Sequence, residues 1–125
     1  SWEPPFHESM FLNPFTQSED LLVVLDGFII KDYQKWKNVV IESMQADRAL
    51  KFKMYKHIVN DLNTAVLSPN SGVVTMKYTW DYITKEDEHY NTDAVVTFVF
   101  KLDKENWKIM HFNVSHGKEK LINNE

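Results

Sequence analysis

The chain has no cysteine, only three glycines and four prolines, and no long apolar run. Without cysteine it can form no disulfide framework, cysteine-ligated zinc site, thiolate nucleophile or iron–sulfur cluster. Its longest apolar runs, such as residues 21–25, fall far short of the roughly 20 residues that a membrane-spanning helix needs. The 14 basic and 18 acidic residues give a net charge of −4, which argues against a nucleic-acid-binding surface because such a surface needs clustered cations. No signal segment is visible, and together with the absence of disulfides this favours a soluble, cytoplasmic protein.

Aromatic side chains, in contrast, are abundant: the 125 residues include 8 Phe, 5 Tyr and 4 Trp. A chain of this length is expected to form one domain that buries roughly two-thirds of its unfolded surface. We divide it into an N-terminal extension over residues 1–20, a main domain over residues 21–117 and a polar tail over residues 118–125. The extension contains three prolines and leaves room for at most one short helix, from about Pro5 to Leu12.

Three local patterns predict the elements of the main domain. Asp26-Gly27 stands between the apolar runs LLVVL and FII, which predicts a β-hairpin with a tight turn. Tyr33, Trp36, Val40 and Met44 recur at intervals of three and four, which predicts a helix over residues 31–48 with a core-facing aromatic stripe. From residue 51 onward the alternating patterns predict strands.

Strand parity then predicts which side chains share a face. If residues 103–106 form a four-residue hairpin loop, Leu102 faces Trp107, Phe100 faces Ile109, Phe98 faces His111, Val96 faces Asn113 and Ala94 faces Ser115. Matching the apolar faces places Val74 near Phe98, Met76 near Val96 and Tyr78 near Ala94. The face expected beneath the helix presents Val74, Met76, Tyr78, Trp80, Tyr82, Val96, Phe98, Phe100, Ile109, His111 and Asn113.

The opposite face of the last two strands is too apolar to remain in water. Only one helix is expected to cover the sheet, so a second copy of the chain is the expected partner for this face. We therefore predict a homodimer through Val95, Val99, Met110, Phe112 and Val114.

The segments VLSPNSGVVTMKYTW and TFVFKLDKENWKIMHFNVSHG resemble the C-terminal half of SnoaL-like members of the nuclear-transport-factor-2-like superfamily. With the preceding hairpin and helix, the resemblance covers about residues 20–117. It implies an α+β fold in which a curved antiparallel sheet wraps around a helix to form a cone-shaped pocket, usually in a dimer. Relatives include polyketide cyclases, steroid isomerases, dehydratases, epoxide hydrolases and an oligomerising kinase association domain. Two features depart from the pattern: Asn113 replaces its second histidine, and residues 1–20 have no counterpart of the long first helix.

Three functions are compatible with these patterns. The first is binding of a small apolar or aromatic molecule, and the second is an isomerase, cyclase or dehydratase-type lyase with His111 as base and Tyr78 as hydrogen-bond donor. The third is a dimerisation module with a filled pocket. No inward carboxylate is expected, because Asp26 lies at a turn and Asp81 and Asp93 lie on the other face. No cofactor is implied, and the five histidines lack the spacing of a metal site. The expected ligand contacts are Trp36, Met76, Trp80, Tyr82, Phe98, Phe100, Ile109 and Asn113.

Overall fold

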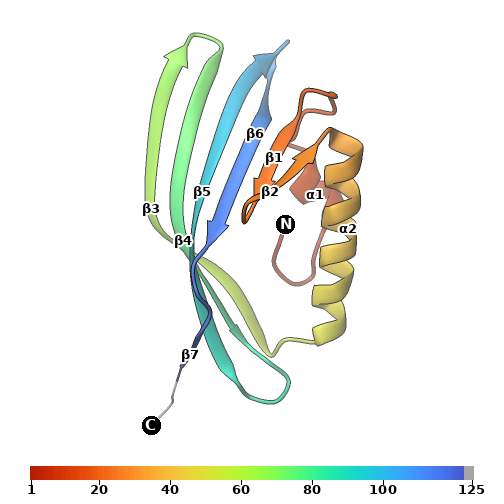
Figure 1. Cartoon of the computed structure of the whole chain (residues 1–125), viewed down its shortest axis with the longest axis vertical. Helices are drawn as coiled ribbons and strands as arrows, with labels where there is room; N and C mark the ends of the chain where they lie inside the picture. Colours follow the sequence, from red (N-terminus) through yellow and green to blue (C-terminus); the bar gives the residue numbers. More distant parts are fainter. Residues whose placement is uncertain (123–125) are drawn as a thin grey trace.

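The computed structural model describes residues 1–122 and has α+β architecture. Its elements are α1 (Glu8–Leu12), β1 (Leu22–Leu25), β2 (Phe28–Lys31), α2 (Tyr33–Leu50), β3 (Met54–Ser68), β4 (Ser71–Ile83), β5 (His89–Asp103), β6 (Asn106–His116) and β7 (Lys120–Leu121). The strands form one sheet in the order β2-β1-β6-β5-β4-β3, with β7 paired to β5. The sheet curves around α1, α2 and the N-terminal segment, which lie together on its concave side (Figure 1). The predicted fold class is confirmed.

The tight turn between β1 and β2 is the one that the sequence predicts. Asp26 and Gly27 both have positive φ angles, 48° and 86°, which a type I′ turn requires and which aspartate and glycine tolerate. The predicted helix is also confirmed as α2, which begins after Asp32 and buries Trp36, Val40 and Met44. The Asp32 side chain accepts a hydrogen bond from the backbone N–H of Lys35, so it caps the first turn.

The register of β5 against β6 is only partly the predicted one. Leu102 pairs with Trp107 and Phe100 pairs with Ile109, as predicted, but Val99 then pairs with His111 and leaves Met110 as a bulge. The predicted pairs Phe98–His111, Val96–Asn113 and Ala94–Ser115 are therefore wrong; the partners are Phe112, Val114 and His116. Since successive side chains alternate between faces, one extra residue moves His111 and Asn113 to the convex face. The predicted pairs Val74–Phe98, Met76–Val96 and Tyr78–Ala94 are confirmed.

The bulge lies where the outer edge of β6 changes partner. The backbone N–H of Ile109 donates to the Pro14 carbonyl, and the N–H of Thr16 donates to the Ile109 carbonyl. Two residues further on, β6 pairs in parallel with β1, starting with His111 against Leu22. The extra residue, Met110, therefore adjusts the strand between two non-local pairings.

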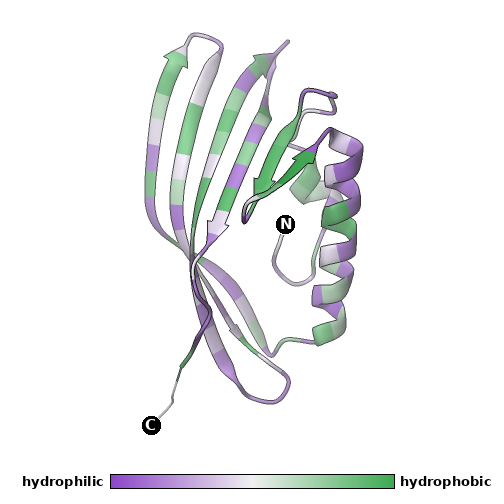
Figure 2. Ribbon diagram, viewed as in Figure 1, coloured by the Kyte–Doolittle hydropathy of each residue, from purple (hydrophilic) through white to green (hydrophobic). Residues whose placement is uncertain are grey.

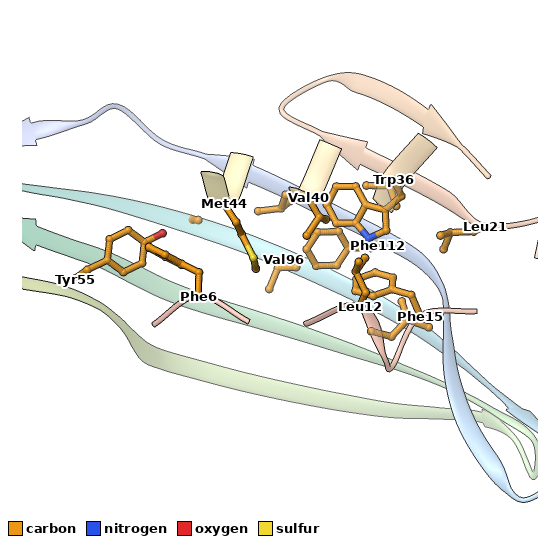
Figure 3. Close-up of a cluster of buried hydrophobic side chains, with 14 of the residues drawn as sticks. Phe6, Leu12, Phe15, Leu21, Trp36, Val40, Met44, Tyr55, Val96 and Phe112 are labelled. Atoms are coloured by element: carbon orange, nitrogen blue, oxygen red, sulfur yellow. The ribbon is translucent and has the colours of Figure 1, made fainter. Parts of the chain in front are cut away.

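The hydrophobic core lies between α2 and the concave face of the sheet. Figure 3 shows Trp36, Val40 and Met44 from α2 pointing toward Val96 and Phe112 on the sheet, with Leu12 and Phe15 beside them. Figure 2 shows apolar residues of α2 alternating with polar ones along the helix, as expected for a helix with one covered side.

The bulge also changes the surface on which a dimer was predicted. Phe112 and Val114 are only 7% and 3% exposed and belong to the core, so their assignment to an outer apolar face is wrong. Val95 is 47% exposed on the other face, and Val99 and Met110 are partly exposed. Homodimerisation through Val95, Val99 and Met110 remains a prediction.

The two terminal segments pack on the domain. Phe6, Leu12 and Phe15 from residues 1–20 are core residues, and α1 occupies part of the predicted helix. Within the predicted polar tail, Lys120 and Leu121 pair with Asn91 and Tyr90 of β5; residues 123–125 of that tail lie outside the described residues. Within residues 1–122, no helix is long and apolar enough to cross a membrane.

Candidate functional site

A cavity of about 630 Å³ lies between α2, the N-terminal segment and the concave face of the sheet. This volume is in the range of small-molecule sites, and such sites are mostly apolar with a few polar groups. The cavity follows that pattern, since its walls are mainly aromatic and aliphatic while a few titratable side chains face it. The apolar walls include Trp2, Phe11, Phe15, Trp36, Val39, Met76, Trp80, Val96, Phe98, Ile109, Phe112 and Val114.

A histidine–aspartate pair lies at the rim of this cavity. His116 Nδ1 is 2.9 Å from Asp26 Oδ2 and 3.1 Å from Oδ1, and the His116 backbone N–H donates to Oδ1 at 2.7 Å. An ionised carboxylate only accepts hydrogen bonds, so Nδ1 donates to Asp26, and in the neutral tautomer with this proton the lone pair is on Nε2. The side chains are 28% and 44% exposed, which keeps the pair accessible.

Tyr78 adds a hydroxyl group to the same region. Its hydroxyl oxygen is 3.3 Å from His116 Nε2, so the phenol donates to the lone pair of the imidazole. Burial, reinforced by the Asp26 charge, raises the pKa of Tyr78 to about 12. The phenol therefore keeps its proton at neutral pH, and it can donate a hydrogen bond to a bound molecule in place of the one to His116.

A second histidine, His57 on β3, lies beside this group. Its ring is 5.2 Å from the ring of Tyr78, and its Nδ1 is 3.7 Å from Oε1 of Glu3. The same Glu3 oxygen accepts a hydrogen bond from the His57 backbone N–H at 2.8 Å. Burial lowers the pKa of His57, with Glu3 acting against this shift and His116 adding to it.

The lowered pKa predicts a loss of stability in acid. Unfolded His57 binds a proton more readily than folded His57, so lowering the pH from about 7.5 to about 5.5 through its ordinary titration range favours unfolding. We expect the urea midpoint to fall less over this range in His57→Gln than in the wild type. The exposed His7, changed to Gln, is the control and should show the wild-type pH dependence. An unchanged pH dependence in His57→Gln would contradict this expectation.

A carboxylate also faces the cavity from the helix side. Asp47, in the last turn of α2, accepts hydrogen bonds at Oδ2 from the indole N–H of Trp2 at 3.0 Å and from the hydroxyl of Tyr55 at 3.3 Å. It also lines a smaller pocket of about 390 Å³, with which the main cavity shares Trp80. The prediction that no carboxylate faces inward is therefore wrong, since both Asp26 and Asp47 do so.

Comparison with solved structures identifies the fold of the chain. A hexachlorocyclohexane dehydrochlorinase (LinA type 2) superposes with a TM-score of 0.72 at 12% identity, over 95% of this chain and 78% of that chain. The chain has the nuclear-transport-factor-2-like fold. A nuclear-transport-factor-2-like protein of unknown function from Shewanella oneidensis MR-1 gives a TM-score of 0.64 at 16% identity, over 86% and 82% of the two chains.

A protein with a cystatin-like fold from Caulobacter vibrioides gives a TM-score of 0.67 at 12% identity, over 89% of this chain and 76% of that one. No protein-family model matches the sequence, and no curated protein matches it. Identities of this size establish the nuclear-transport-factor-2-like fold and leave the activity to the residues of the cavity.

Most of the predicted ligand contacts line the cavity of this nuclear-transport-factor-2-like fold. Tyr82 instead lines the smaller pocket, and His111, Asn113 and Phe100 line neither of the two. His111 and Asn113 face away because of the Met110 bulge, so the prediction that His111 lies in the pocket is wrong. The predicted residues that do line the cavity are Trp36, Met76, Tyr78, Trp80, Phe98 and Ile109.

Sequence reasoning missed Asp26, Asp47, His57 and His116. The sequence predicts a turn at Asp26, and His116 lies at the end of the predicted main domain, next to the predicted polar tail. Parallel pairing of Leu25 with Val114 brings the turn next to the end of β6, and no local pattern in either segment indicates that pairing. Within residues 1–122, no three side chains of the metal-ligating types gather to form a metal site.

Proposed function

We propose that this protein binds a small apolar or aromatic molecule in the cavity beneath α2. The observation that carries the proposal is the cavity of about 630 Å³, which is lined mainly by apolar residues of the sheet, α2 and the N-terminal segment. A cavity of this size filled with water would leave its aromatic walls hydrated. Removing apolar surface from water contributes about 25 cal/mol per Å², so a ligand with an apolar body gains most of its affinity from these walls.

Blocking the cavity from the helix side tests this proposal. Ser43 is a small residue of α2 that lines the cavity, so Ser43→Trp fills part of the space. We expect this change to weaken binding of the neutral dye N-phenyl-1-naphthylamine by about tenfold or more, because an indole displaces much of the volume of a two-ring ligand. Binding is measured as the rise in dye fluorescence on titration with protein.

The matched control places the same tryptophan elsewhere on α2. Gln45 is exposed, and Gln45→Trp should bind the dye as the wild type does. Thermal melting of both variants checks that they remain folded. Failure of the folded wild type to bind the dye, or equal binding by Ser43→Trp, would refute the proposal.

The histidine–aspartate pair supports a second candidate, an isomerase, cyclase or dehydratase-type lyase. The Nε2 lone pair of His116 accepts a hydrogen bond from the Tyr78 hydroxyl at 3.3 Å, and a substrate bound between the two groups would replace that hydrogen bond. A base beside a donor can remove a proton from a carbon next to a carbonyl while the donor stabilises the oxygen on which charge develops. The base assigned from the sequence was His111; the geometry of the cavity favours His116 in that role, with Tyr78 retained as donor. A dehydrochlorinase among the structural neighbours is consistent with elimination chemistry in this fold.

A further inference from the structure

Asp47 indicates the chemical class of the ligand that the cavity binds, an inference that rests on the proposed function. Asp47 is partly buried where the cavity meets the smaller pocket. Both of its protein hydrogen bonds go to Oδ2, from Trp2 and Tyr55. A carboxylate has about four acceptor positions, so Oδ1 retains capacity for another donor.

Asp47 forms no ion pair with a cation of the described residues. The neighbouring Arg48 bonds to Glu8 and to the Phe6 carbonyl, and His116 bonds to Asp26. Burial raises the pKa of Asp47 against the opposing effect of its two hydrogen bonds, and a nearby cation would favour the ionised form.

Four aromatic residues, Phe52, Trp80, Tyr82 and Tyr90, line the smaller pocket together with Asp47. Tyr55 lies 5.0 Å from Phe52 and 5.4 Å from Trp80, and Trp80 lies 4.6 Å from Tyr82, measured between ring centroids. In addition to Asp47, the smaller pocket is lined by two acidic residues, Glu86 and Glu119, and by one basic residue, Lys85. Aromatic faces attract cations, most strongly when the cation is shielded from water. The aromatic faces and the carboxylates thus favour the same sign of ligand charge.

From this arrangement we infer that the ligand carries a protonated amine, which lies against Trp80 and donates to Asp47. Its apolar body extends into the main cavity toward Tyr78 and His116. The amine balances the carboxylate that the fold leaves without a cationic partner, and the rings surround its alkyl or aryl carbons. A ligand with a carboxylate at the same place meets Asp47 as a like charge.

A structural role for Asp47 makes a different prediction. If Asp47 serves only to hold Trp2 and Tyr55, its charge does not affect which ligand binds. In Asp47→Asn the amide oxygen would still accept both hydrogen bonds, while the negative charge is removed. This substitution therefore separates recognition of charge from support of the fold.

The test compares three biphenyl ligands of similar size with different charge: 4-(aminomethyl)biphenyl, biphenyl-4-methanol and biphenyl-4-carboxylate. Each is titrated at neutral pH against wild-type protein loaded with N-phenyl-1-naphthylamine, and displacement of the dye is followed by fluorescence. We expect the amine to bind about tenfold more tightly than the alcohol, because a hydrogen bond to a charged group is worth more than a neutral one, and the carboxylate to bind most weakly.

Two variants assign this preference to Asp47. Asp47→Asn should abolish the preference for the amine while the alcohol binds as before. Asp61→Asn makes the same change of charge at an exposed position of β3 and should keep the preference. If Asp47→Asn does not fold, equal binding of the amine and the alcohol by the wild type still refutes the inference.

Equal binding of amine and alcohol by the wild type, or a preference that survives in Asp47→Asn, would overturn the inference. It would also fail if no biphenyl displaced the dye while the dye itself bound, and the proposed function would then stand. Absence of dye binding to the wild type would remove both.

Discussion

Replacing His116 with alanine is expected, under the proposed isomerase or lyase function, to slow base-catalysed proton removal in the cavity by about 10²- to 10⁴-fold, the usual contribution of a positioned general base. Asp26 holds Nδ1 and so presents Nε2 as the basic atom. A suitable reporter is the ring opening of 5-nitrobenzisoxazole, in which a base takes the proton from carbon, the nitrogen–oxygen bond breaks and a phenolate is released. The phenolate is followed by its absorbance, with the acceleration over buffer as the measured quantity.

His111→Ala is the matched control for this prediction. His111 faces away from the cavity opposite Val99, so its loss should leave the rate unchanged. Asp26→Asn should also lower the rate. The amide oxygen of asparagine can still accept the hydrogen bond from the imidazole, but it carries no negative charge to stabilise the imidazolium. Asparagine tolerates the positive φ of 48° at this turn, so the hairpin should persist. A rate that depends on His111 and not on His116 would reverse the assignment of the base.

Replacing Trp36 with alanine is expected to lower the free energy of unfolding by about 3–5 kcal/mol, the range for removal of a large buried aromatic side chain. Trp36 is 2% exposed, and its ring lies 5.6 Å from both Phe15 and Phe112. It thus joins the N-terminal segment, α2 and β6 in one cluster. Urea unfolding followed by circular dichroism measures the loss, and a chain that unfolds before denaturant is added meets the expectation as well.

Trp107→Ala is the control for the change at Trp36. Trp107 is 48% exposed near the start of β6, so the same truncation removes little buried surface and should cost about 1 kcal/mol or less. Similar losses for the two variants would show that the cluster around Trp36 does not dominate stability. A second change, Trp36→Phe, should cost less than Trp36→Ala because most of the ring contacts remain.

Local chemistry in the sequence is sufficient for several of the elements. Asp26 and Gly27 tolerate positive φ angles, which predicts the position of the first hairpin. The spacing of Trp36, Val40 and Met44 predicts α2. The pairing of β4 with β5 also follows from matching apolar positions, as Val74 against Phe98 shows. Each of these features depends either on residues that are close in the sequence or on a simple alternation of apolar and polar residues. Both can be recognised from the sequence alone.

The candidate site depends on contacts between distant parts of the chain. Trp36, Tyr78 and Trp80 could be predicted as lining residues because their strand or helix parity is regular. His116 and Asp26 meet only through the parallel pairing of β1 with β6, 90 positions apart. Trp2 reaches Asp47 across 45 positions.

The sequence by itself determined the α+β fold, its hairpin, its helix and an aromatic face on the sheet. Which residues line the cavity was decided only by the tertiary structure. The deciding feature is Met110, which is unpaired where β6 passes from Pro14 and Thr16 to β1. One unpaired residue reverses the parity of everything after it, so Phe112, Val114 and His116 turn inward and His111 turns outward. The bulge lies where β6 changes from one edge partner to another, so the sequence of β6 alone does not predict it.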